Sequence, residues 1–221
     1  MKELNCFLER FMTDERREQM TRILAHRTKY LTVVLEDIFQ PQNASAVLRT
    51  CDCFGIQDVH IIENRNEFNI NPEVVMGSTK WLSLHRYNQQ QNNTREALRK
   101  LKQQGYRIVA TTPHKNDVDL ESLNLNAGKL ALVFGTELTG ISDVACDEAD
   151  EFMKIPMFGF TESFNISVSA AIAIHHLKHK LHQSSINWQL SENDREQVYL
   201  HWLKRSIKKC DLLIEKFHSD I

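Results

Sequence analysis

Several features that would assign this chain to a special class of protein are missing from its 221 residues. No uninterrupted apolar stretch approaches the length of about 18 residues that a membrane-spanning helix needs. The N-terminal segment MKELNCFLERFMTDERREQM lacks the apolar core of a secretory signal peptide. The chain has five cysteines, which is an odd number, and their spacing is not that of a disulfide framework. We therefore expect a globular protein of the reducing cytoplasm.

Charge of one sign is not in excess either, because 27 Lys and Arg oppose 29 Asp and Glu and the net charge is −2. A near-neutral chain is not expected to bind nucleic acid indiscriminately. Basic residues nevertheless gather near both ends of the chain, where two runs flank a neutral middle. Such runs are often only solvated helix faces, but two of them also fit the footprint of a polyanion. The candidates for this contact are Arg16, Arg17, Arg22, Arg27, Lys204 and Lys208.

Short apolar runs rich in β-branched residues alternate with helical patterns through the middle of the chain. Strands are predicted at 31–35, 58–62, 81–87, 107–112, 130–134 and 151–156, and helices at 43–54, 94–104, from 142 and at 165–182. This alternation predicts an α/β fold with a mostly parallel sheet. We predict one such domain over 30–182, between an N-terminal helical arm (1–29, helical over 3–29) and a C-terminal helical arm (183–221).

Ligands of parallel sheets bind at the carboxyl ends of the strands, so the loops that follow the strands are the places to look for chemistry. Thr111 ends one strand, and the next is followed by GTELTG, in which two glycines bracket Glu137 and let the backbone approach a ligand closely. No GxGxxG fingerprint occurs, so an ordinary dinucleotide site is unsupported. Ser163 and Asn165 then begin a helix, where they either cap it or face a ligand.

The helix predicted over 43–54 carries Asn43 and Arg49. The neighbours of Arg49 in the sequence are small or apolar, which predicts a partly buried guanidinium that needs a partner. That partner is either a carboxylate that only stabilises the fold or a group of the functional site. The residues alone leave these two interpretations open.

A histidine face on the last helix of the domain raises the question of a metal. His175, His179 and His182 are spaced to lie on one side of a helix, an arrangement that could ligate zinc. No cysteine or carboxylate completes the set, and Lys178 and Lys180 interleave with the histidines. The pattern favours a solvated helix end, and no metal is expected.

Three segments, taken in order, resemble the motifs of the SpoU/TrmH family of SPOUT RNA methyltransferases. The first has Asn43 followed six residues later by Arg49, the second is FGTELTGIS, and the third is IPMFGFTESFNISVSAAIAI. Each motif is weak alone, but together they span roughly residues 31–175. The resemblance implies a SPOUT-type parallel sheet with a deep trefoil knot near its C-terminal end, a rare exception to the rule of unknotted chains. It also implies a homodimer formed through the knot region.

The activity that the resemblance implies is methylation of a ribose 2′-oxygen in RNA, with S-adenosyl-L-methionine as cofactor. The similarity of residues 21–50 and of the basic arms points to guanosine 18 in the D-loop of tRNA as the substrate. Two alternatives remain at this point. One is methylation of ribosomal RNA or of another tRNA position, and the other is an RNA-binding relative that has lost catalysis.

The resemblance also assigns roles to individual residues by their place in the motifs. The cofactor site is implied to include Thr111, Gly135, Ile155 and Phe164. The family usually has Leu at the position of Phe164. The catalytic site is implied to include Arg49, Asn43, Glu137, Ser163 and Asn165. Arg49 is the proposed catalytic group, either as a base whose proton loss is assisted or as a stabiliser of the developing oxyanion.

Overall fold

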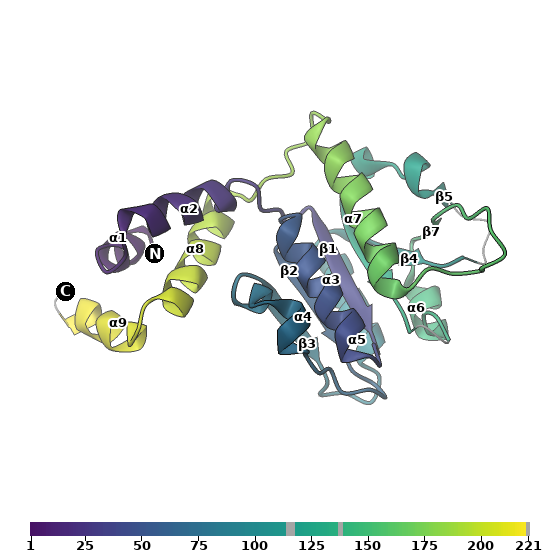
Figure 1. Ribbon diagram of the computed structural model, residues 1–221, viewed down its shortest axis with the longest axis horizontal. Coiled ribbons are helices and arrows are strands. Elements are labelled where there is room, and N and C mark those ends of the chain that lie inside the picture. The colour runs from purple at the N-terminus through teal and green to yellow at the C-terminus, as the bar shows by residue number, and fades with distance from the viewer. Residues whose placement is uncertain (114–117, 137–138, 220–221) are drawn as a thin grey trace. The chain divides into compact units, whose positions relative to one another are not determined.

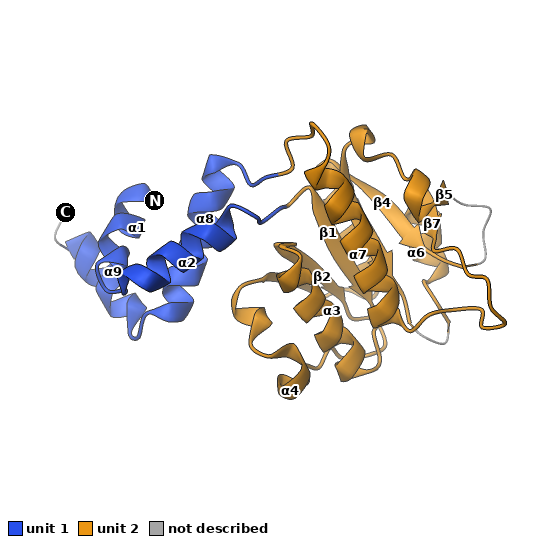
Figure 2. Cartoon of the chain, turned by 45° about the horizontal axis from the view of Figure 1, so that its top comes forward, with its two compact units in different colours: residues 1–28, 189–221 blue, residues 29–188 orange. Residues whose placement is uncertain are grey.

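The computed structural model describes residues 1–113, 118–136 and 139–219 of the chain. The chain divides into two compact units, shown in different colours in Figure 2. Unit 1 comprises residues 1–28 and 189–221, so the two terminal segments fold together, and unit 2 comprises residues 29–188. In the described part of the chain, no helix is both long and apolar enough to cross a membrane.

Unit 2 is built on a parallel sheet of seven strands, counted over the described residues, in the order β3-β2-β1-β6-β4-β7-β5. The strands are β1 (Leu31–Glu36), β2 (Asp58–Ile62), β3 (Ser83–Tyr87), β4 (Tyr106–Thr111), β5 (Val118–Asp119), β6 (Lys129–Phe134) and β7 (Glu151–Lys154). Strand β1, which lies between β2 and β6, is buried along its whole length, as its mostly apolar sequence requires. The prediction of a parallel α/β fold is confirmed, although the short β5 was not predicted.

Helices cover both faces of this sheet, as Figure 1 shows. They are α3 (Pro41–Cys53), α4 (Pro72–Val75), α5 (Asn93–Gln103), α6 (Asp143–Glu148) and α7 (Ile166–His182). On β1, Val33 faces the core that α3 and α7 complete, whereas Val34 faces the core that α5 and α6 complete. This alternation buries β-branched side chains on both faces of the sheet and explains the continuous apolar runs in the sequence.

The ends of the helices follow the local sequence. Gly55 and Gly105 come just after α3 and α5 and have φ angles of 73° and 83°, the left-handed conformation expected after a helix. Ser142 caps α6 as predicted, because its hydroxyl accepts a hydrogen bond from the Ala145 N–H at 3.1 Å. The two glycines end their helices and Ser142 begins α6, so these helix ends lie where the sequence predicts them.

Unit 1 consists, over its described residues, of the helices α1 (Lys2–Glu9), α2 (Asp14–Leu24), α8 (Glu192–Ser206) and α9 (Cys210–Ser219). The prediction of one helix over residues 3–29 is wrong. The helix breaks before Thr13, whose hydroxyl accepts a hydrogen bond from the Arg16 N–H and so starts α2 as a new N-cap. The buried Trp202 of α8 lies in the core of this unit.

A buried histidine in unit 2 makes stability depend on pH. His60 of β2 is only 4% exposed, and its Nδ1 lies 3.0 Å from the Tyr87 hydroxyl. Burial of the ring, assisted by the neighbouring His85, lowers the pKa of His60 to about 3. The unfolded chain has the ordinary histidine pKa of about 6.5 and binds the proton first as the pH falls. The stability that the neutral ring provides is present above pH 6.5 and is lost progressively between about pH 6.5 and 3.

We therefore expect the free energy of unfolding to fall more steeply on acidification in the wild type than in a His60→Gln variant. Between pH 7 and pH 5 the difference in this fall is about 2 kcal/mol, since one extra proton binds the unfolded state below pH 6.5. Urea denaturation of both proteins at the two pH values measures it. Equal falls in the two proteins would show that His60 does not titrate on unfolding.

Candidate functional site

Three of the predicted cofactor positions lie along one edge of the sheet. Strands β6, β4 and β7 are neighbours and parallel, so the loops after them meet at their carboxyl ends. Thr111 ends β4 and donates a hydrogen bond from its hydroxyl to the Val133 carbonyl of β6 at 2.8 Å. Gly135 follows β6 directly, and Ile155 follows β7 and packs partly buried against the core.

The loop after β6 closes so tightly that Gly135 has no room for a side chain. A Cβ atom there would lie 2.2 Å from the Gly140 carbonyl oxygen and 2.4 Å from the Ile141 nitrogen. The loop is closed by two backbone hydrogen bonds between Thr136 and Gly140, of 2.9 and 3.0 Å, and Gly140 has a φ of 68°. Glu137, a predicted catalytic residue, lies in this loop but outside the described residues.

The segment after β7 offers main-chain groups to a ligand. Among the described residues, no main-chain group of residues 156–164 bonds to another main-chain group, so these N–H and C=O groups are open to other partners. The segment also exposes aromatic side chains, of which Phe158 is 97% exposed and Phe164 is 42% exposed. Ser163 is exposed in the same segment. Free hydrogen-bonding groups beside apolar rings suit a ligand with a heterocyclic base.

A hydrogen bond joins the first and third motifs across 122 positions of the chain. Asn165 is the N-cap of α7, where its Oδ1 accepts hydrogen bonds from the Ser167 N–H at 2.9 Å and from the Ser167 hydroxyl at 2.6 Å. Its Nδ2 donates to Asn43 Oδ1 at 3.1 Å, and Asn43 Nδ2 donates to Gln40 Oε1 at 3.0 Å. Asn165 therefore both caps a helix and contacts the predicted site.

Two substitutions at Asn165 separate these two tasks. Asn165→Ala removes the cap and should lower the free energy of unfolding by about 1 kcal/mol. Asn165→Ser keeps an N-cap hydroxyl and should restore that stability, but its side chain is too short to reach Asn43. Chemical denaturation measures the first effect, and the RNA methylation that the motif resemblance implies measures the second. Full activity in the serine variant would show that the contact with Asn43 is not needed.

The expectation that the Arg49 guanidinium is partly buried is wrong, because Arg49 is exposed on α3. The buried face of the helix is formed by Ala44, Val47, Leu48 and Cys51. Arg49 is one helical step beyond Leu48 and so turns away from that face. Within the described residues its guanidinium has no hydrogen-bond or ion-pair partner, so no carboxylate seen in the structure explains this arginine.

A buried carboxylate that the sequence analysis missed anchors the end of the Gly135 loop. Glu36, the last residue of β1, is 2% exposed. It accepts hydrogen bonds from the Ser142 N–H at 2.9 Å, the Ser142 hydroxyl at 2.6 Å and the Thr94 hydroxyl at 2.6 Å. An acid directly after the apolar residues of a strand is the signal that could have identified it, since a buried carboxylate needs such partners.

The basic residues predicted to contact a polyanion belong to unit 1, and one of them needs correction. Arg27 is 2% exposed, and its guanidinium lies 5.1 Å from the centre of the Trp202 ring, so it cannot form part of the surface. Arg16 bonds to Gln19, and Arg17 forms an ion pair with Asp14 at 2.8 Å. The members of the set that are exposed are Arg22, Lys204 and Lys208.

The histidine face of α7 is partly engaged in ring contacts. The rings of His175 and His179 lie 6.3 Å apart and nearly parallel, and the His182 ring lies 4.4 Å from that of Trp188. Among the residues that the structure describes, no group of three or more His, Cys, Asp or Glu is placed to hold a metal ion.

The fold and the site define an α/β protein whose candidate ligand-binding loops meet at the carboxyl ends of a parallel sheet. Its sequence lacks the GxGxxG fingerprint of dinucleotide-binding proteins. The model of the SpoU rRNA Methylase family matches residues 30–175, and the chain belongs to this family. The resemblance identified from the three motifs is thus confirmed.

Known relatives match beyond the family domain. The chain is 44% identical over 212 residues to the tRNA (guanosine(18)-2'-O)-methyltransferase of Borreliella burgdorferi, covering 96% of this chain and 95% of the relative. It is 35% identical to the enzyme of the same name from Thermus thermophilus, over 73% of this chain and 81% of the relative. A solved structure of the Aquifex aeolicus TrmH/SpoU tRNA modifying enzyme superposes with a TM-score of 0.78 and 27% identity, over 89% of this chain and 98% of that chain.

Proposed function

We propose that this protein transfers a methyl group from S-adenosyl-L-methionine to the ribose 2′-oxygen of guanosine 18 in the D-loop of tRNA. The observation that carries the proposal is the 44% identity to the Borreliella enzyme named for this reaction, which extends over 96% of the chain. A match of this extent includes most of the terminal segments that form unit 1, as well as the family domain at 30–175.

The residues at the carboxyl edge fit the cofactor. We assign its site to Thr111, Gly135, Ile155 and Phe164. The open main-chain groups of residues 156–164 can hydrogen-bond an adenine and an amino-acid moiety, and the side chains of Ile155 and Phe164 provide apolar contacts. The cofactor supplies a methyl group on a cationic sulfonium, which is a good leaving group. The remaining task of the protein is to align the ribose hydroxyl and handle its proton.

Arg49 is assigned the central catalytic role. In its ordinary protonated form the guanidinium cannot take up the hydroxyl proton, but its positive charge can stabilise the oxyanion that develops at the ribose 2′-oxygen. The exposure of Arg49 leaves this charge available to RNA. Asn43 and Asn165, joined by their hydrogen bond, would orient the substrate together with Ser163 and Glu137.

Unit 1 is proposed to bind the body of the tRNA. Its exposed cations can neutralise backbone phosphates and release counterions, which favours binding regardless of the net charge of the chain. The residues assigned to this surface are Arg16, Arg17, Arg22, Lys204 and Lys208. Arg27 is left out because it is buried against Trp202.

The trefoil knot, the homodimer and the cytoplasmic location also belong to this proposal. The knot is supported by α7, which follows β7 but packs against α3, the helix that follows β1.

The dimer is supported by the exposed apolar side chains of Phe158, Phe160 and Val168, which a second copy would cover. The cytoplasm is supported by five free cysteines. Sedimentation equilibrium tests the dimer directly.

The experiment that tests the proposal incubates the purified protein with labelled S-adenosyl-L-methionine and either tRNA or ribosomal-RNA transcripts. We expect label in a tRNA that carries guanosine 18 and none in the ribosomal RNA. Label in ribosomal RNA alone would favour the family's other substrate class. Binding of tRNA without any transfer would favour an RNA-binding relative that has lost catalysis.

A further inference from the structure

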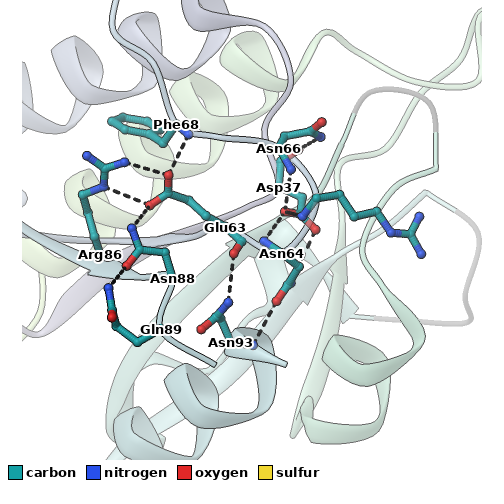
Figure 3. Close-up of polar contacts among 10 residues, drawn as sticks. Asp37, Glu63, Asn64, Asn66, Phe68, Arg86, Asn88, Gln89 and Asn93 are labelled. Carbon is teal, nitrogen blue, oxygen red and sulfur yellow. Dashed lines mark hydrogen bonds and ion pairs between the residues drawn. The ribbon is translucent and has the colours of Figure 1, made fainter. Parts of the chain in front are cut away.

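Two carboxylates hold the loop after β2 through hydrogen bonds at the carboxyl edge of the sheet, as Figure 3 shows. At its start, Asp37 Oδ1 accepts hydrogen bonds from the N–H groups of Asn64 at 2.6 Å and Arg65 at 2.9 Å. The N–H of Asn66 lies within 3.4 Å of the same oxygen, and the side-chain amide of Asn66 donates to the Asp37 carbonyl at 2.7 Å. One carboxylate thus fixes three successive residues.

The far end of the same loop is fixed by a second carboxylate. Glu63 accepts a hydrogen bond from the Phe68 N–H at 2.8 Å and holds the guanidinium of Arg86 through two hydrogen bonds of 2.7 and 2.9 Å. Asn88 donates to Glu63 at 3.1 Å. Asp37 itself has a φ of 53°, a conformation that costs energy in a residue other than glycine and that the surrounding contacts must maintain.

This clamped loop carries an arginine whose guanidinium has no partner among the described residues. Arg65 is exposed, and within the described residues nothing bonds to its guanidinium. Most arginines of unit 2 are neutralised by carboxylates: Arg86 by Glu63, Arg95 and Arg99 by Glu148, and Arg107 by Glu151. Among the arginines described in this unit, only Arg49 and Arg65 lack such a partner. Both come from segments that follow the neighbouring strands β1 and β2.

The clamp also connects Arg65 to the proposed catalytic residues. Asp37 belongs to the loop between β1 and α3, and three residues later the same loop carries Gln40, which accepts the hydrogen bond from Asn43. The positions of the Arg65 loop and of Asn43 are therefore set by one short segment. The proposed cofactor positions follow β4, β6 and β7, so a guanidinium after β2 matches the other substrate, whose backbone carries a phosphate at every linkage between nucleotides.

We infer that Arg65 binds a backbone phosphate of the RNA substrate and that Asp37 holds it in position for this contact. The inference rests on the proposed function for the identity of the RNA. The planar guanidinium matches the geometry of a phosphate, and a backbone that is already fixed reduces the entropy lost on binding.

The test measures the Kd of the full-length protein for a tRNA transcript over a range of salt concentrations. For Arg65→Ala we expect Kd to rise about tenfold, and the slope of log Kd against log salt to decrease by about 1. The rate at saturating tRNA and the affinity for the cofactor should stay unchanged. Lys80→Ala is the matched control, because Lys80 is exposed and comes just before β3, at the opposite edge of the sheet. A Kd and slope for Arg65→Ala equal to those of the wild type would overturn the inference.

A second variant tests the positioning by Asp37. Asp37→Gly removes the carboxylate but tolerates the positive φ. We expect it to weaken tRNA binding as well, and we expect Arg65→Ala to add little to it, since an unclamped arginine contributes little. A full additional tenfold loss in the double variant would contradict the clamp. Because these are binding measurements, they decide the role of Arg65 even if the wild type bound tRNA but methylated none, an outcome that would count only against the proposed function.

Discussion

We expect Arg49→Ala to lower the rate of methyl transfer to tRNA by about 10²–10³-fold at saturating substrates, the size of effect that follows the loss of a group stabilising a developing charge. The affinity for S-adenosyl-L-methionine should change little, because the proposed cofactor positions lie on other loops. The free energy of unfolding should stay within about 0.5 kcal/mol, because Arg49 is exposed and the buried face of α3 is formed by other residues. Single-turnover kinetics and calorimetry measure these quantities.

Arg49→Lys is the control for charge. It keeps a cation at this position but loses the planar fork, so an intermediate rate would indicate that charge alone carries part of the effect. A loss of cofactor binding in Arg49→Ala would assign Arg49 a structural role. A rate equal to that of the wild type would remove it from the catalytic site.

Gly135→Ala should weaken cofactor binding. Its Cβ would lie 2.2 Å from the Gly140 carbonyl oxygen, so the loop would have to open and the paired hydrogen bonds of Thr136 and Gly140 would be disturbed. We expect the Kd for S-adenosyl-L-methionine to rise at least about tenfold and the free energy of unfolding to fall by about 1–3 kcal/mol. Titration calorimetry and urea denaturation check the two values.

Gly159→Ala is the matched control for this change. The nearest atom to a Cβ at Gly159 is the Thr161 nitrogen at 4.0 Å, so the same methyl group is added to the neighbouring ligand loop without a clash. The free energy of unfolding should then stay close to that of the wild type, which makes Gly159→Ala the control for the clash. If Gly135→Ala bound the cofactor normally, the closed loop would not be part of the cofactor site.

The fold was predictable where the sequence pattern is local and continuous. The apolar run of β1, the glycine after α3 and the serine cap of α6 each specify their own structure through nearby residues. The break between α1 and α2 was missed because the helical apolar pattern continues across it and only the cap at Thr13 marks the new start. The two-residue strand β5 is too short for any alternation to be visible.

The candidate site was only partly predictable, since its contacts join distant parts of the chain. The motifs placed Asn43 and Asn165 in one site, and the structure adds the hydrogen bond between them. The exposure of Arg49 depends on which way α3 turns, which its small and apolar neighbours do not decide. The burial of Arg27 depends on its packing against Trp202, which is far away in the sequence. The carboxylates Glu36 and Asp37 bond mainly to later loops, so no short motif contains both partners.

The most direct test of the central claim maps the methyl group in tRNA treated with the wild-type protein and S-adenosyl-L-methionine. We predict a single 2′-O-methyl mark at guanosine 18, and no transfer to a synthetic tRNA with 2′-deoxyguanosine at that position alone. A mark at another nucleotide, a methyl group on the base, or undiminished transfer to the deoxy substrate would contradict the account.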